Sequence, residues 1–189
     1  MNSYAESRSR AARRKGVSAP AYGPIDAALG FALFYYLVAR GGPTIEAVVT
    51  ELFATVSPAT VGFGLAGFLW FVFVVTTIDQ VRRQLAALGV GSERDVSRQA
   101  RSRGPPSSAR LAAYLGLILV GGGLALATFA SAIDTAIALL PALAALDVGA
   151  FVSVEFVVMV VFFVSYSVAT HSLDRLLIGG LRALLSTPV

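Results

Sequence analysis

The sequence predicts an all-α, polytopic helical membrane protein with about four transmembrane helices and short interfacial amphipathic helices. Hydrophobic residues make up 56% of the 189 residues and charged residues only 14%, whereas soluble domains carry about 25% charged residues. Several apolar stretches approach the roughly 20 residues that cross a bilayer as a helix. The basic residues gather in alternate connections between these stretches, as they do in a multi-pass membrane protein.

The chain opens with a basic arm and a short apolar stretch. Residues 1–24 carry five basic side chains without an apolar period, which indicates a cytoplasmic arm. Residues 25–38 are apolar except for Asp26, but as a helix they rise only about 21 Å, less than the roughly 30 Å of the hydrocarbon core. A crossing therefore needs residues 22–40, with Asp26 at the favourable N-terminal end of the helix.

The same opening also fits a cleaved signal sequence. Basic residues followed by a short apolar core are its usual form, and Arg13 with Arg14 offers a twin-arginine pair. Residues 37–39 make a poor small-residue cleavage site, and removal would leave three spans. We therefore expect a retained helix.

Residues 25–79 are expected to form a first transmembrane hairpin. Gly41, Gly42 and Pro43 predict the end of one helix and the start of another. Residues 45–56 have an apolar face at helical spacing and predict an amphipathic helix in the outer interface. Residues 58–78 are uncharged and predict the second span.

Residues 80–110 predict a basic cytoplasmic loop between the two membrane halves. Its arginines suit anionic lipid head groups. We single out four of them as candidate contacts: Arg94, Arg98, Arg101 and Arg103. Nucleic-acid binding is unlikely, because the loop lacks aromatic side chains for base stacking.

Residues 111–171 are expected to form a second transmembrane hairpin. Its spans are residues 111–132 and 148–170. The apolar piece between Asp134 and Asp147 is broken by Pro141, which places it at the outer interface or packed into the bundle. Residues 172–189 have one leucine-rich face and predict an amphipathic cytoplasmic tail on the inner leaflet.

The basic residues also predict the orientation. Of 15 in the sequence, only Arg40 falls in an outer connection. The positive-inside rule then places both termini on the cytoplasmic or inner side. The expected location is a cell membrane or a virion membrane, with the lipid bilayer as the first partner.

The two halves contain weakly similar dipeptides in the same order. Leu29-Gly30, Ile45-Glu46 and Ile78-Asp79 match Leu115-Gly116, Ile133-Asp134 and Leu173-Asp174. The similarity suggests a duplicated hairpin, although chance matches are frequent in apolar sequences of few residue types.

Glu155 is the acidic residue that the sequence places inside a span. A carboxylate there costs roughly 2.5 to 3.5 kcal/mol on insertion scales. It predicts either a proton or cation relay or a carboxyl that hydroxyl groups satisfy, with Tyr36 or Tyr166 as candidate partners. His171, the only histidine, lies near Asp174 at the inner boundary, where a structural role is favoured over pH sensing.

Small residues predict two faces at which helices approach closely. One lies in the second span and the other in the third. The candidate residues are Gly62, Ala66 and Gly67, and Gly121, Gly122 and Gly123.

These features favour a small structural or assembly subunit that packs with itself or with partner membrane proteins. The chain has no cysteine and one histidine, and it lacks the sequence motifs of hydrolases, phosphate-binding loops and zinc enzymes. We therefore expect no enzyme activity, no cofactor and no metal site. The alternative is a homo-oligomeric transporter, channel or proton-coupled subunit that uses Glu155.

Overall fold

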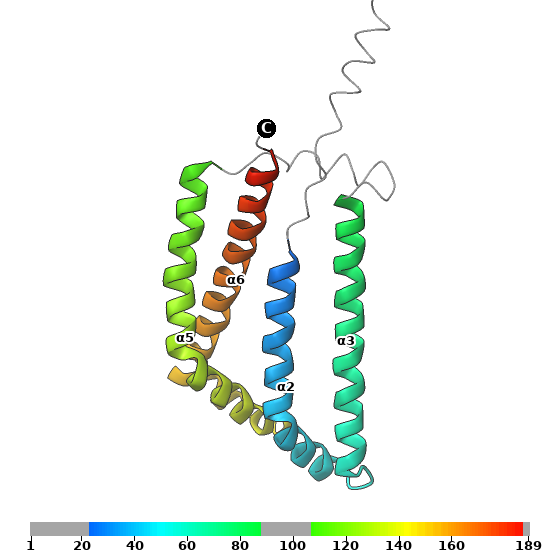
Figure 1. The fold of residues 1–189 in the computed structure, drawn as a ribbon. Coiled ribbons are helices and arrows are strands. Elements are labelled where there is room, and N and C mark those ends of the chain that lie inside the picture. Colours follow the sequence, from blue (N-terminus) through cyan, green and yellow to red (C-terminus); the bar gives the residue numbers. More distant parts are fainter. Residues whose placement is uncertain (1–22, 88–106, 187–189) are drawn as a thin grey trace, which may run out of the picture.

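The computed structural model describes residues 23–87 and 107–186, and these residues form helices without any strand (Figure 1). The elements in chain order are α2 (Pro24–Leu52), α3 (Pro58–Ala87), α5 (Ser108–Ala144), the short 3₁₀ helix η1 (Val148–Val152) and α6 (Val154–Ser186). The all-α prediction is confirmed for this part of the chain.

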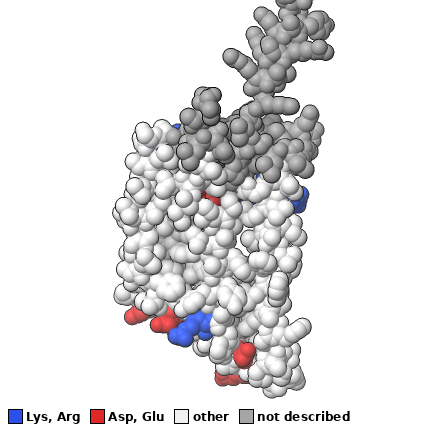
Figure 2. Space-filling model, in the orientation of Figure 1, with Lys and Arg blue, Asp and Glu red and all other residues white. Residues whose placement is uncertain are grey.

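Three helices are long and apolar enough to cross a membrane, as predicted for a membrane protein. They are Pro58–Ala86, Ser108–Ala144 and Val154–Leu181. Figure 2 shows the matching surface, in which a band without acidic or basic atoms separates the charged groups at the two ends of the visible face. An uncharged band of this kind suits the hydrocarbon core of a bilayer.

The helices form two hairpins of unequal tightness. The α5–α6 pair is in the most extensive contact, and α2 lies beside it and contacts both helices (Figure 1). On its other side α2 contacts α3. Among the described elements α3 contacts α2 alone, so it stands at the edge of the bundle.

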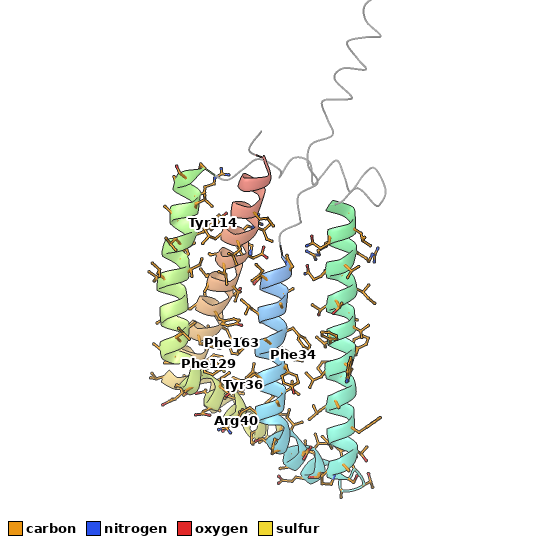
Figure 3. The ribbon with its side chains drawn as sticks, in the orientation of Figure 1. Phe34, Tyr36, Arg40, Tyr114, Phe129 and Phe163 are labelled. Atoms are coloured by element: carbon orange, nitrogen blue, oxygen red, sulfur yellow. The ribbon has the colours of Figure 1, made fainter. Side chains whose placement is uncertain are left out.

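The predicted helix boundary at Gly41, Gly42 and Pro43 is wrong, because α2 continues through these residues. Figure 1 shows that the last turns of α2 run obliquely, and Arg40 lies close to the bend (Figure 3). Pro43 cannot donate a backbone hydrogen bond, which accounts for a bend without a break. The predicted interfacial amphipathic helix is therefore the end of α2.

The piece between Asp134 and Asp147 was expected to be separate from the third span, whereas α5 continues through it to Ala144. The end of α5 also runs obliquely, and the bend lies near Phe129 (Figures 1 and 3). Thr128 and Thr135 donate hydroxyl hydrogen bonds to carbonyls four residues earlier, at 2.8 Å each. Such back-bonding is known to bend helices.

The oblique end of α5 packs on α2 at Gly41. A Cβ built on Gly41 would lie 3.5 Å from Leu140 Cδ1 and 3.7 Å from Ile137 Cγ1. Gly41 is accordingly buried. The absence of a side chain there lets the two helices cross closely.

The fourth span begins later than predicted, because residues 148–152 form η1 and α6 begins at Val154. Asp147 holds this turn by accepting a hydrogen bond from Gly149 N at 3.0 Å. At its other end α6 runs on to Ser186 without a break. The part of the predicted cytoplasmic tail that the structure describes is therefore the continuation of α6.

The core lies between the second hairpin and α2. Ala125, Ala132, Ile133 and Phe162 are buried, and Leu37 of α2 packs against them. Aromatic rings extend this contact, with Phe129 5.7 Å from Phe162 between ring centroids.

The two hairpins have a similar outline. Each has a long first helix with an oblique C-terminal end, a short connection, and a long return helix (Figure 1). Glu46, Asp134, Asp79 and Asp174 lie in the C-terminal halves of α2, α5, α3 and α6. The duplication of the hairpin stays a prediction.

Candidate functional site

The most polar interior region lies between α6 and the first turns of α2. Tyr166, Thr170 and Asp174 are four residues apart in α6 and therefore share one face of that helix. Each makes a hydrogen bond to α2, to groups between Gly23 and Leu29. We call these three side chains the α6 polar ladder.

Asp174 caps α2 from another helix. Its carboxylate accepts hydrogen bonds from Gly23 N at 2.7 Å and from Ile25 N at 3.1 Å, and the residue is only 2% exposed. Gly23 has a φ of 119°, a backbone conformation that glycine adopts most easily. No side chain of α2 caps its own N-terminus. An anion is favourable there, because the first backbone N–H groups of a helix lack partners.

Asp26 of α2 is the partner of Thr170, the second member of the ladder. Thr170 donates its hydroxyl hydrogen bond to Asp26 Oδ1 at 2.6 Å, and His171 Nδ1 lies 3.7 Å from Asp26 Oδ2. Asp26 is in the first turn of α2, as expected, but the cap itself belongs to Asp174. His171 therefore pairs with Asp26, which the sequence analysis did not foresee.

Tyr166 completes the ladder by donating a hydrogen bond to the Leu29 carbonyl oxygen at 2.8 Å. Tyr166 does not satisfy Glu155, because it lies 11 residues further along α6, about 16 Å along the axis, and its hydroxyl bonds to α2. The Tyr36 ring lies against Phe129, with centroids 5.4 Å apart. Figure 3 labels Tyr36 and Phe129 at this contact. The ladder thus links two helices that lie more than 130 residues apart in sequence.

Glu155 lies in the first turn of α6, where its side chain is exposed. With the fourth span predicted over residues 148–170, Glu155 was expected one to two turns inside that span. The difference follows from the late start of α6 at Val154. A carboxylate in the first turn of a helix is favoured by the helix dipole. The relay role of Glu155 stays a prediction.

The predicted small-residue faces are used unequally. A Cβ on Gly121 would lie 3.1 Å from the Ser165 carbonyl oxygen, and one on Gly122 would lie 4.0 Å from Ala169 Cβ. These two glycines therefore face α6. Gly123 faces open space.

In α3 the predicted face is divided. A Cβ on Gly62 would lie 2.9 Å from Glu46 Oε1, so Gly62 turns toward α2. Gly67 faces open space and Ala66 is exposed. The four candidate loop arginines, Arg94, Arg98, Arg101 and Arg103, lie outside the described residues.

Sequence reasoning missed the α6 polar ladder. The signal was present as polar residues every four positions from Tyr166 to Asp174, but the third member was assigned to a separate tail. Within residues 23–87 and 107–186, no group of three or more His, Cys, Asp or Glu side chains is placed to hold a metal ion.

Comparison of the chain with known protein families, curated proteins and solved structures finds no match.

Proposed function

We propose that the protein is a small integral membrane subunit that assembles with copies of itself or with a partner membrane protein. The observation that carries the proposal is the outward face of α3. This helix has one neighbour in the described part of the chain, and none of its residues from 58 to 86 is buried. A helix with one intramolecular neighbour has most of its surface left for lipid or for another protein.

The shape of that face favours a protein neighbour. Phe63, Gly67 and Phe71 follow one another at four-residue spacing, so they lie on one side of α3. Phe63 is 83% exposed and Phe71 64% exposed, and Gly67 between them faces open space. Small residues flanked by large ones let membrane helices approach closely. We call this surface, with Val74, the outer face of α3.

The proposed topology has four crossings with both termini inside. Its support is that α2 runs alongside α3 and contacts it through rings in the middle of both helices (Figures 1 and 3). The stretch of α2 between Asp26 and Arg40 carries no charge. Because α2 contacts the middle of α3, it lies in the hydrocarbon layer wherever α3 crosses that layer.

Cysteine chemistry tests the topology cleanly, because the chain has no natural cysteine. Ser18→Cys and Ser57→Cys stand before α2 and after it. We expect a membrane-impermeant thiol reagent to label them from opposite sides of sealed vesicles. Labelling of both from the same side would show that α2 does not cross.

Disulfide crosslinking tests the assembly. Val74→Cys places a thiol on the outer face of α3, where Val74 is 45% exposed, and Val120→Cys is its control on α5, where Val120 is 73% exposed. We expect oxidised Val74→Cys to give a crosslinked dimer, or an adduct with a cysteine-bearing partner, in native membranes. Equal or stronger crosslinking at Val120 would refute the outer face as the contact.

A second pair of variants separates assembly from folding. Gly67→Leu and Gly123→Leu both add a side chain where a Cβ would meet open space, so neither should disturb the fold. We expect Gly67→Leu to abolish the Val74→Cys crosslink and Gly123→Leu to leave it. Mass measurement of the nanodisc-embedded complex then tells a homo-oligomer from a complex with another protein.

A further inference from the structure

The outward side of α3 follows a seven-residue repeat. Uncharged residues recur there in alternate steps of four and three positions, which is the spacing of the a and d positions of a coiled coil. Every residue at these positions is exposed. The repeat includes Gly67, Phe71 and Val74 of the outer face and extends it in both directions. We call the whole set the α3 seam: Thr60, Gly64, Gly67, Phe71, Val74, Ile78, Val81 and Leu85.

The α3 seam points away from α2. Gly62, Leu69 and Thr76 are seven residues apart and occupy the opposite position of the same repeat. A Cβ on Gly62 would lie 2.9 Å from Glu46 Oε1, and Leu69 and Thr76 line cavities that residues of α2 also line. Because α2 is the one neighbour of α3 within residues 23–87 and 107–186, that part of the chain leaves the α3 seam uncovered.

The α3 seam continues past the hydrocarbon core. Asp79 is the first charged residue of α3 and marks the inner edge of the core. From Asp79 to Leu85 the only apolar residues are Val81, which is 50% exposed, and Leu85, which is 42% exposed, and both belong to the seam. Leu85 lies about 9 Å beyond Asp79 along the axis, whereas the head-group layer is about 5 to 8 Å deep. Lipid tails do not reach this end of the seam, so its apolar side chains favour a protein neighbour.

Membrane insertion determines how two copies of α3 meet. Every copy crosses in the same direction and at the same depth, so two seams run parallel and each residue lies opposite its own counterpart. The α3 seam has no charged residue, so this contact places no like charges directly opposite each other. Asp79 and Arg83 form their ion pair outside the seam, with Arg83 Nε 2.8 Å from Asp79 Oδ2. The seam is therefore compatible with a second seam.

The period of the α3 seam also favours a helix as the neighbour. A repeat of 3.5 residues is shorter than the 3.6 residues of a helical turn, so the seam drifts by about 20° every seven residues. It stays in contact along its length only with another helix that winds around α3 in a left-handed sense. At the outer end a Cβ on Gly64 or Gly67 would meet open space, which lets two backbones approach closely there.

We propose that a second copy of the chain covers the α3 seam, with the two α3 helices parallel and in register from Thr60 to Leu85. The proposal rests on the assembly proposed above and names its partner. The contact is isologous, because each copy presents the same residues to the other.

A cysteine scan with two tags tests the register. Full-length chains with the same single cysteine but different affinity tags are produced together and oxidised in their native membranes. We expect Val81→Cys and Leu85→Cys to give a disulfide-linked product that carries both tags. Arg83→Cys is the control, because Arg83 is exposed at the same depth but lies outside the seam. It should give several-fold less product.

An exchange of charges identifies the second copy. Val81→Glu and Val81→Lys are each made in the Val74→Cys chain. Val81 is exposed and lies past Asp79, so neither charge enters an apolar interior. Each variant alone should lose most of the Val74→Cys crosslink, because like charges then face each other at residue 81. Produced together, the two should restore it, and the mixed product should exceed either like-charged product by roughly tenfold.

The same exchange at Arg83 is the matched control. Arg83→Glu and Arg83→Lys in the Val74→Cys chain should pair without preference, because residue 83 lies outside the seam. A charge preference at residue 83 as large as that at residue 81 would overturn the proposed register.

The outcomes separate this proposal from the assembly on which it rests. No crosslink at any position, together with a single-chain mass in nanodiscs, would refute both. A crosslink from Val74→Cys to a different protein would keep the assembly and overturn the second copy as the partner. Product with both tags in equal yield at Val81→Cys and Arg83→Cys would keep self-assembly and overturn the α3 seam as the contact.

Discussion

The two hairpins have the same outline but different contacts, and the side chains between the helices explain the difference. In the second hairpin Gly121 and Gly122 face Ala169 and the Ser165 carbonyl, so α5 and α6 approach closely. In the first hairpin aromatic rings stand between the helices, with Phe34 and Phe68 5.9 Å apart between centroids. Small residues allow contact between helix backbones, whereas rings hold the helices apart.

The comparison teaches which contacts hold a membrane bundle together. Lipid tails are as apolar as leucine, so burial of apolar surface gives little drive for association between helices. Close packing and buried hydrogen bonds are therefore the contacts that can hold the helices together. The second hairpin is held by close packing at its glycine face, and the α6 polar ladder supplies buried hydrogen bonds that tie it to α2. The first hairpin has fewer such contacts and keeps a groove.

The largest expected effect comes from adding a side chain at Gly121, where α5 and α6 approach closely. In Gly121→Leu the new Cβ would meet the Ser165 backbone oxygen at 3.1 Å, and a backbone atom cannot move aside as a side chain can. We expect the free energy of unfolding to fall by about 3 kcal/mol, the upper end of overpacking costs. Denaturation followed by circular dichroism in mild detergent measures it.

Gly123→Leu is the matched control, because a Cβ at that position meets open space on the same helix. Its free energy of unfolding should change by less than about 0.5 kcal/mol. If both variants lost the same stability, the close contact between α5 and α6 would not be the reason for the tightness of the second hairpin.

The next effect concerns the link between the hairpins. Asp174→Ala leaves Gly23 N–H and Ile25 N–H without their acceptor and should lower the free energy of unfolding by about 2 kcal/mol. Asp79→Ala is the control, because Asp79 is exposed and pairs with Arg83 of its own helix. Hydrogen exchange should show faster exchange in the first turns of α2 for Asp174→Ala alone. Unchanged exchange there would mean that the cap does not hold α2.

The sequence predicted the helical class and the positions of three long apolar helices, because composition and length determine both. The errors fall at Gly41 to Pro43, at Asp134 and after Thr170, where a local breaker or charge was taken as an end. In each case neighbouring helices support the continuing backbone. Asp174 shows the limit best, since its acceptor role depends on an N-terminus about 150 positions away.

A smaller effect tests whether the rings hold α3 to α2. Phe73→Leu removes the ring contact to Phe31 of α2, worth about 0.5 to 1.5 kcal/mol, and the ring contact to Trp70 within α3. We expect a broader distance distribution between spin labels on α2 and α3, with little change between labels on α5 and α6. Phe71→Leu is the control, because that ring is exposed and contacts no other ring within residues 23–87 and 107–186. If the distance distribution broadened equally in both variants, the ring contacts would not be what holds α3 to α2.

The smallest expected effect is that of Glu155→Gln. Glu155 is exposed in the first turn of α6, where a charge contributes about 0.3 to 1 kcal/mol through the helix dipole. The variant should therefore keep the assembly mass of the wild type and lose no more than about 1 kcal/mol of stability. Assembly mass and proton flux into liposomes are measured on the same preparation. If the wild type carried a flux that the variant lost with its assembly intact, Glu155 would act as a relay. In that case the transport function would replace the assembly function, with its relay group in the first turn of α6.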